Sequence, residues 1–237
     1  IFVGGKYEYT AMDVQHGIAV VAETRPITYT LTTSEDEGSE ITEGRTYTHH
    51  STENINVSFG AYNGYEIDTV TVNGTTYNSA DEMEAAGIVL TSKETAYASD
   101  GSTHTAAVYG TISLPRTQDN DVSVTSKKRY YKVVFEEYIR GFANDVFVYT
   151  PHDISTPVYA EFGADLPAAP YGAGTETLIG TDNYTISDWY KDYNGNIFYN
   201  AIDVDTAKVP ANDITLYAFW EKNPNVVLDK TVKIEKV

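Results

Sequence analysis

The feature that most constrains the fold is a period-two alternation of side chains near the end of the chain. The two alternating sets are Ile214, Leu216, Ala218 and Trp220, and Thr215, Tyr217 and Phe219. Residues two apart on a β-strand lie on the same face, so the first set predicts a core-facing side. The second set is aromatic or polar, which suits a partly covered outer face.

Two earlier features extend this prediction. Trp189, the other tryptophan of the chain, stands on a predicted strand just before the turn Asn194-Gly195-Asn196. Two indoles at strand positions can bury a large apolar area in a small module. Upstream, Val146–Tyr149 and Val158–Phe162 read as two strands, and the pattern breaks at Gly163 and Leu166–Pro170.

The layout of residues 145–221 resembles the internalin-type B-repeat family, small β-grasp-like modules of bacterial surface proteins. The matching residues are Trp189-Tyr190, Gly195, Phe198 and the closing run Thr215-Leu216-Tyr217-Ala218-Phe219-Trp220. Asp188 stands where the family usually has Gly, and the Asn-Gly-Gly usual after the first strand is absent. The resemblance implies a non-catalytic part of a cell-surface protein.

The region before this module is also predicted to be β-rich. A strand over Tyr65–Val72 ends in Asn73-Gly74, the strongest short hairpin signal. This unit loosely resembles recurrent units of bacterial extracellular repeat domains. A short helix follows near residues 80–86, because Ser79 can cap it, Glu82 completes a capping box and Gly87 can end it.

Together these patterns predict a mainly β chain, with two or more small β-rich modules in series and a β-grasp-like C-terminal one. The predicted division is an N-terminal strand pair over 1–25, a β-rich extracellular module over 27–138, a B-repeat-like module over 145–222, and a linker with a terminal strand over 223–237. We expect 145–222 to fold as a unit, because both flanking linkers carry Gly, Asn or Pro.

Composition narrows the possible partners. The formal net charge of the 237 residues is −18, which argues against nucleic acid and anionic membranes, because phosphate binding needs Lys and Arg. The cluster Lys127-Lys128-Arg129 is therefore expected at a solvated hairpin tip. No apolar run approaches the roughly 20 residues of a membrane span, so no membrane insertion is expected. Cysteine is absent, as is common on Gram-positive surfaces, although a cytosolic protein can also lack it.

Motifs for catalysis are scarce, and the chain is predicted not to be an enzyme. There is no Gly-x-Ser-x-Gly, no phosphate-binding Gly-rich loop and no His-Glu-x-x-His. Abundant carboxylates leave a glycosidase-type pair open, but surface charge explains them equally well. His49-His50 suggests a metal only weakly, because adjacent strand residues point to opposite faces. No catalytic, cofactor-binding or metal-binding residue is therefore assigned.

One string has the spacing of a calcium loop. Asp192, Asn194, Asn196 and Asp203 fall at positions 1, 3, 5 and 12 of an EF-hand-style loop. The required Gly is one place early, at Gly195, and the flanks read as strands. We therefore interpret the string as a hairpin turn, for which Asn-Gly is the preferred pair.

Tyrosines supply the other functional hypothesis. A sugar-stacking surface is one interpretation, because aromatic faces pack on apolar sugar faces; half-buried strand positions are the other. The tyrosines concerned are Tyr62, Tyr65, Tyr77, Tyr97 and Tyr109. Two functions follow: an adhesive or structural segment of an extracellular bacterial surface protein that binds a protein or glycan, or a carbohydrate-binding accessory region of a larger secreted enzyme. Ile1 opens a mature-looking segment without a signal peptide, so a longer parent protein stays open.

Overall fold

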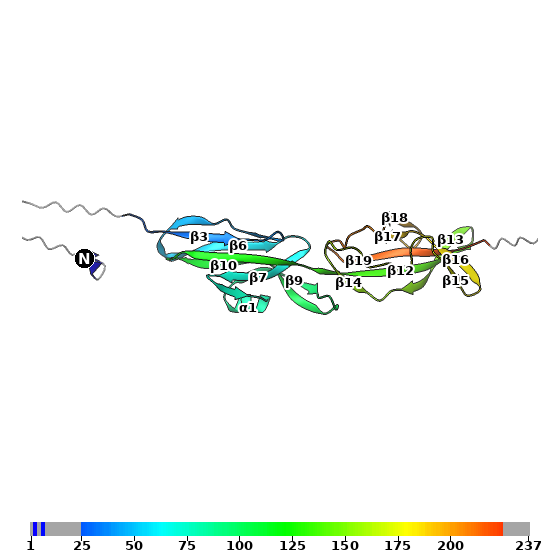
Figure 1. The fold of residues 1–237 in the computed structure, drawn as a ribbon, viewed down its shortest axis with the longest axis horizontal. Helices are drawn as coiled ribbons and strands as arrows, with labels where there is room; N and C mark the ends of the chain where they lie inside the picture. Colours follow the sequence, from blue (N-terminus) through cyan, green and yellow to red (C-terminus); the bar gives the residue numbers. More distant parts are fainter. Residues whose placement is uncertain (1, 4–5, 8–24, 225–237) are drawn as a thin grey trace, which may run out of the picture.

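The computed structural model describes residues 2–3, 6–7 and 25–224, and this part of the chain is mainly β (Figure 1). The first two strands, β1 (Phe2–Val3) and β2 (Lys6–Tyr7), pair antiparallel. The strands predicted over 17–22 and 226–237 lie outside the described residues. The mainly β class is confirmed, and so is the short helix, α1 (Ala80–Ala85).

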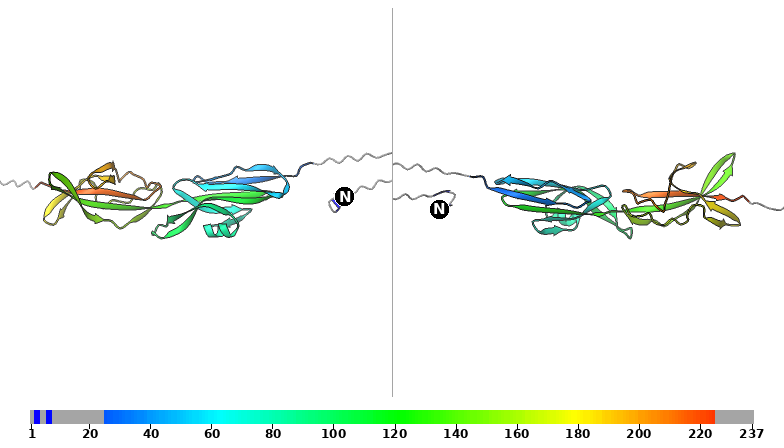
Figure 2. Two further views of the ribbon diagram at one scale, coloured as in Figure 1. Left: turned by 180° about the vertical axis from the view of Figure 1, so that it is seen from behind. Right: turned by 45° about the horizontal axis from the view of Figure 1, so that its top comes forward.

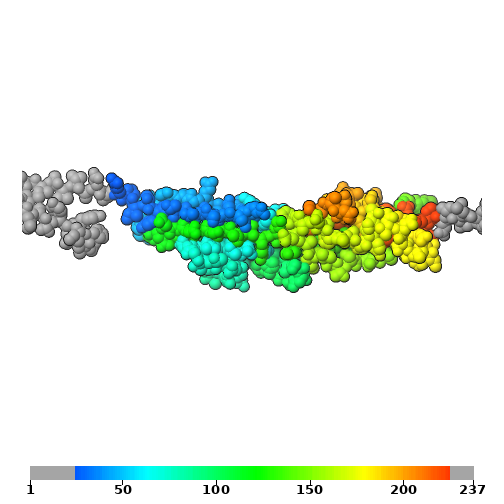
Figure 3. Space-filling view, viewed as in Figure 1, coloured from blue at the N-terminus to red at the C-terminus, as the bar shows by residue number. Residues whose placement is uncertain are grey.

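Strands β3 to β19 form one large curled hydrogen-bonded network around two hydrophobic cores. The first core uses residues from Leu31 to Val124, and the second uses residues from Tyr131 to Trp220. We call residues 25–128 the N-terminal lobe and residues 130–224 the C-terminal lobe. The lobes lie end to end along the long axis, seen as ribbons and as a space-filled body (Figures 1, 2 and 3).

Two groups of paired strands enclose the core of the N-terminal lobe. Strand β7 is flanked by β8 and β11, with β3 and β5 beyond β11, and β10 is flanked by β6 and β9, with β4 beyond β6. The strands are β3 (Thr28–Ser34), β4 (Ser39–Ile41), β5 (Arg45–Thr48), β6 (His50–Ala61), β7 (Tyr65–Val72), β8 (Thr75–Tyr77), β9 (Val89–Tyr97), β10 (Thr103–Arg116) and β11 (Asn120–Lys128).

Local signals explain the β7–β8 hairpin and α1. Asn73 and Gly74 both have positive φ, 49° and 82°, which a two-residue primed turn requires and which this residue pair tolerates. The Ser79 hydroxyl accepts from the backbone N–H of Glu82, and the Glu82 carboxylate accepts from the backbone N–H of Asn78. The helix is too short to be stable alone; its fully buried Met83 fastens it to the core.

The C-terminal lobe is built on β12 and β19, which run parallel side by side. Strands β13 and β14 pair with the outer side of β12, and β16 and β17 pair with the outer side of β19. The strands are β12 (Tyr130–Ala143), β13 (Val146–Ile154), β14 (Val158–Glu161), β15 (Glu176–Ile179), β16 (Asp182–Ile186), β17 (Trp189–Tyr193), β18 (Phe198–Ile202) and β19 (Ile214–Lys222).

Both tryptophans belong to this core, as predicted. Trp189 and Trp220 are each 1% exposed, and the Trp189 ring meets Phe135 edge to face at 5.0 Å. The indole N–H of Trp220 donates to Oε2 of Glu137 at 2.8 Å, and that of Trp189 donates to the carbonyl of Tyr171. The buried indole N–H groups therefore keep hydrogen-bond partners, as polar groups in a core require.

The core of the C-terminal lobe draws on both sides of the predicted boundary at residues 139–144. Strand β12 runs through most of that segment, and its Tyr131, Val133 and Phe135 belong to the second core. Asn144 and Asp145 have φ of 51° and 65° and form the turn into β13. Of the residues that suggest a linker, Asn144 thus belongs to a hairpin turn and Gly141 lies within β12 opposite Val148, so residues 145–222 lack a central strand of their lobe.

A fragment comparison tests this arrangement. Residues 128–224 should give one cooperative thermal transition, whereas residues 145–224 should not, because removal of β12 exposes one edge of β19 and uncovers both tryptophans. Circular dichroism melts of the two fragments measure the difference. A cooperative transition in the shorter fragment would show that β12 is dispensable.

Substitution of Trp220 tests the closing strand. Trp220→Ala should lower the free energy of unfolding by roughly 3–5 kcal/mol, because it leaves a cavity and strips Glu137 of its donor. Trp220→Phe keeps most of the volume and should cost less. Urea melts report both values, and a loss below about 1 kcal/mol for the alanine variant, typical of surface sites, would place the indole outside the core.

Candidate binding surface

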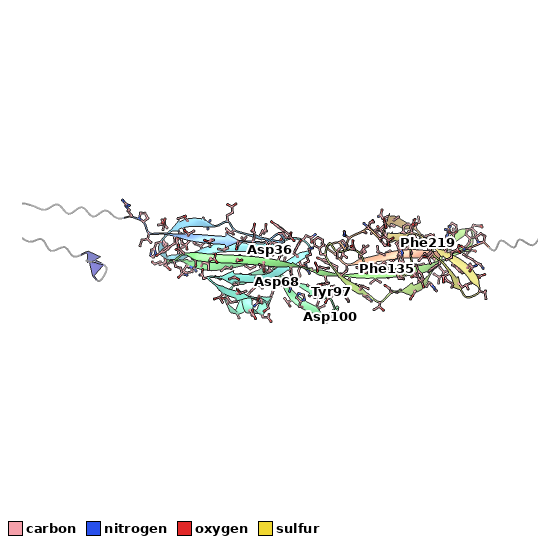
Figure 4. The ribbon with its side chains drawn as sticks, viewed as in Figure 1. Asp36, Asp68, Tyr97, Asp100, Phe135 and Phe219 are labelled. Carbon is pink, nitrogen blue, oxygen red and sulfur yellow. The ribbon has the colours of Figure 1, made fainter. Side chains whose placement is uncertain are left out.

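Aromatic rings gather on the side of the C-terminal sheet that faces away from the core. On β19, Tyr217 and Phe219 are half-buried on this side, while Leu216 and Trp220 point into the core. Figure 4 labels Phe219, which lies on this side, and Phe135, which lies in the core. We call the group the aromatic face; its members are Tyr138, Tyr149, Tyr190, Tyr193, Phe198, Tyr217 and Phe219.

The rings of the aromatic face pack against one another. Tyr193 stacks on Phe198 at 4.3 Å, and the centroids of Tyr138 and Tyr193 lie 4.6 Å apart. Tyr149 meets Phe198 edge to face at 4.8 Å. Such geometries are the favoured ones for aromatic pairs. The face is therefore a second apolar layer that holds the β17–β18 hairpin, with ring edges left at the surface.

Four phenol groups on this face have a raised pKa and so stay protonated in neutral solution. Burial, with a hydrogen bond donated by the Tyr138 hydroxyl to Glu136 at 3.0 Å, raises the pKa of Tyr138 to about 12. Burial also raises the pKa of Tyr190, Tyr193 and Tyr217. These hydroxyls can exchange hydrogen bonds with a ligand, but none is set up as a base or nucleophile.

The two neighbouring carboxylates on β12 point to opposite sides. Glu136 lies on the aromatic face, whereas Glu137 is buried in the core against Trp220. Burial raises the pKa of Glu137, although the hydrogen bond from Trp220 favours its charged form. Because the sheet separates the two groups, they do not form a glycosidase-type acid and base pair.

Strand β13 carries four exposed large apolar side chains, Val146, Phe147, Val148 and Ile154. It pairs with β12 along one side, and no strand of the described residues covers its other side. At the tip of this hairpin Phe142 is 64% exposed and Phe147 50% exposed. We call this surface the apolar edge; its members are Phe142, Val146, Phe147, Val148 and Ile154. Figure 2 shows the hairpin standing away from the rest of the lobe.

Arg140 connects the apolar edge to the aromatic face. Its guanidinium carbon lies 3.6 Å from the Phe147 ring centroid and 5.5 Å from that of Phe219. It also pairs with Glu221 on β19, with a nitrogen–oxygen distance of 3.2 Å. Stacking of Arg on an aromatic ring is favourable and orients both groups. The two surfaces thus share one charged residue at their border.

Two of the tyrosines considered for sugar stacking lie instead at the joint between the lobes. Tyr65 meets Phe162 edge to face at 5.7 Å, and Tyr97 lies 4.9 Å from Tyr159. The partner rings cover Gly64 and Gly101, both at positive φ, where a Cβ would collide with them. These aromatic pairs therefore fix one lobe against the other and are not free to stack on a sugar.

The remaining three tyrosines of that set do not form a common platform with this pair. Tyr77 packs against the first core. Tyr62 and Tyr109 are 48% and 44% exposed, and Tyr109 lies over Gly60 on the neighbouring strand. Four of the five tyrosines lie on strands, as the strand interpretation expects, whereas Tyr62 lies between β6 and β7. The sequence did not show which strands would be neighbours.

The basic cluster is also placed differently from the prediction. Lys127 and Lys128 end β11, and Arg129 is the single residue between β11 and β12, so this segment is not a hairpin tip. Arg129 pairs with Glu94, and Lys128 with Glu161. The chain passes from one lobe to the next here without turning. Of these ion pairs, Lys128–Glu161 joins the two lobes, whereas Lys127 pairs with Glu66 and Asp68 of its own lobe.

The adjacent histidines do not form a metal site in the described structure. His49 lies near the Tyr29 ring, at 6.0 Å between centroids, and His50 begins β6 near Glu53. Among the described residues, no group of three or more His, Asp or Glu side chains is arranged to hold a metal ion.

The calcium-like string forms a hairpin, as interpreted. Gly195 has φ of 91°, and the Asn194 side chain accepts from the backbone N–H groups of Asn196 and Ile197. Asp192 stands opposite Tyr199 in the β17–β18 hairpin. Asp203 comes four residues after Tyr199, which at strand spacing places it about 13 Å from the position opposite Asp192. The side chain of Asp203 accepts bonds within its own turn. The string therefore does not converge on one ion.

No family model matches the chain, and no curated protein matches it. In the described part of the chain, no helix has the length and apolar character needed to cross a bilayer.

The candidate binding residues are therefore identified from the geometry of the structure. The sequence did contain a signal for the apolar edge, because Val146, Phe147 and Val148 are consecutive apolar residues and so occupy both faces of a hairpin strand.

The raised pKa of Glu137 predicts how stability depends on pH. The native state holds the Glu137 proton more tightly than the unfolded chain, so this residue's contribution to stability is present near pH 4.5 and lost as pH rises through the raised pKa. Glu137→Gln removes that loss and keeps an acceptor for Trp220. The free energy of unfolding of this variant should therefore rise relative to wild type between pH 4.5 and 7. Urea melts across that range measure the difference, and parallel curves would mean that Glu137 titrates normally.

Proposed function

We propose that this chain is a non-catalytic segment of a bacterial cell-surface protein, a β-rich spacer that also presents a protein-binding surface. The modules in series and the β-grasp-like C-terminal module, with its internalin-type resemblance, are part of this proposal. The two lobes suit the spacer role because they lie end to end (Figure 3).

The observation that carries the spacer role is the joint. Strands β11 and β12 cross it with one residue between them. Arg129 of that crossing is hydrogen-bonded to both lobes: its N–H donates to the carbonyl of Gly64, and its carbonyl accepts from Phe162. A joint of this kind resists bending, since bending would break backbone bonds and separate packed rings.

The apolar edge supports the binding role. Monomeric proteins seldom leave such a group of large apolar side chains uncovered without a partner. The unpaired side of β13 also offers backbone N–H and C=O groups to an added strand. Residues 141–151 contain a single charged group, Asp145, in a chain of formal charge −18. A protein strand can approach here with little charge repulsion.

The aromatic face favours a second candidate, a carbohydrate-binding accessory region of a larger secreted enzyme. Tyr190, Tyr193 and Tyr217 on this face are partly exposed, and their raised pKa keeps their hydroxyls as neutral hydrogen-bonding groups that a sugar could contact. The close packing of these rings on one another weighs against it, because a stacking platform needs an open ring face.

Protein and glycan arrays probed with the full chain test the proposal. We expect binding to one or more proteins that Val148→Lys reduces at least about tenfold, because it places a charge within the apolar edge. Val89→Lys is the control, since Val89 is also an exposed valine, 61% against 40% for Val148, and lies on β9 of the other lobe. It should bind like wild type.

Other outcomes contradict parts of the proposal. Glycan binding that Tyr190→Ala or Tyr217→Ala on the aromatic face removes, with no protein binding, would favour the accessory-region function. Turnover of a glycan or ester substrate that a single Asp or Glu substitution abolishes would defeat the non-catalytic proposal.

A further inference from the structure

A cavity of about 240 Å³ opens beside the start of α1 in the N-terminal lobe. Strands β7, β10 and β11 supply three of its walls, and the segment that leads into α1 supplies the fourth. Its polar lining consists of Glu66, Asn78, Ser79, Asp81, His104, Thr105 and Lys127. Asp68, which lies on β7 near the opening of the cavity, is labelled in Figure 4.

Glu66 is the unusual residue of this cavity. Its side chain is only 3% exposed, yet it is ionisable and stands on a strand whose next residue, Ile67, belongs to the core. Oε1 contacts His104 Nε2 at 2.7 Å and Lys127 Nζ at 3.2 Å. Oε2 is buried and has no hydrogen-bond partner among the described residues.

An unpartnered buried carboxylate oxygen is costly, and natural proteins rarely retain one without a use. In the described structure the other buried side-chain atoms without partners are arginine Nε donors, so Glu66 Oε2 is the one unmatched acceptor. Glu66 lines the cavity, so a small rotation of its carboxylate would bring Oε2 to a bound group that donates a hydrogen bond, which would remove the cost.

Charge and size limit what that group can be. Glu66 and Asp81 carry negative charge and Lys127 carries positive charge. The two carboxylates would repel a bound anion, and the lysine would repel a bound cation. The cavity is smaller than the about 300–1,000 Å³ pockets that hold drug-sized ligands. Ala80, Ala106 and Ala107 give it a small apolar wall.

We infer that this cavity binds a small uncharged polyhydroxyl compound, a single sugar ring or a polyol. One hydroxyl donates to the Glu66 carboxylate, and Lys127 and the Asn78 amide donate to others, while the alanine wall contacts the carbon skeleton. Lys127 has a second acceptor 3.5 Å away, Asp68 Oδ1, so its ammonium can shift from Glu66 when a hydroxyl arrives. This inference does not rest on the apolar edge or the aromatic face.

Titration of the ¹⁵N-labelled full chain followed by NMR tests it. Glucose, N-acetylglucosamine and glycerol at millimolar concentrations should shift the backbone amide signals of Ala80, Asp81 and Thr105. Oligosaccharides of the same sugars separate recognition of a free ring from recognition of a chain end. Acetate and ethylammonium at equal ionic strength should leave these signals unmoved.

Three variants locate the binding. Glu66→Gln replaces the charged acceptor and should weaken binding at least about tenfold. Thr105→Phe, at an exposed position of the cavity mouth, should abolish binding while leaving the Glu66 contacts in place. Glu84→Gln, on the far part of α1 where Glu84 pairs with Lys93, should bind like wild type.

Each outcome of these titrations supports or overturns the proposed binding site. Shifts that Thr105→Phe and Glu66→Gln remove, with melting temperatures near that of wild type, support the site. Should Glu66→Gln fail to fold, Thr105→Phe decides alone. Shifts with acetate or ethylammonium only, shifts that persist in Thr105→Phe, or none with any sugar or polyol overturn the inference, the last meaning that the cavity holds water alone.

Discussion

The parallel pairing of β12 with β19 is the constraint on which the C-terminal lobe depends. It joins segments about 80 residues apart, from Val133↔Ile214 to Arg140↔Glu221. With both central strands fixed, their alternation sends Phe135 and Trp220 into the core and Tyr138 and Phe219 to the other side. The core, the aromatic face and the position of the β12–β13 hairpin all follow from this one register.

Much of the fold could be predicted from local patterns in the sequence. The alternation over Ile214–Trp220, the Asn73-Gly74 turn and the capping box at Ser79 each contain their own physical cause within a few residues. The boundary near residue 140 could not be predicted in this way. Gly and Asn favour linkers and hairpin turns alike, and only the distant partner β19 decides that β12 belongs to the C-terminal lobe.

The candidate surfaces were harder to predict for a related reason. A tyrosine on a strand is compatible with a core edge, a joint or an open surface. Tyr65 and Tyr97 became joint residues because Phe162 and Tyr159, about 100 and 60 residues later, cover them. Glu66 is a similar case: its sequence context is an ordinary alternating strand, and its burial depends on His104 and Lys127 from two other strands.

The joint explains why glycines and rings occur together where the lobes meet. Gly64 and Gly101 turn with positive φ and have no side chain, so Phe162 and Tyr159 can lie directly on the backbone. That close approach brings the Phe162 N–H to the carbonyl of Arg129 and lets β14 pair with the start of β12. A bulkier residue at either glycine would push the rings outward and open the angle between the lobes. The angle between the two lobes therefore depends on these two glycines, and the proposed stiffness of the joint depends on them as well as on the β11–β12 crossing.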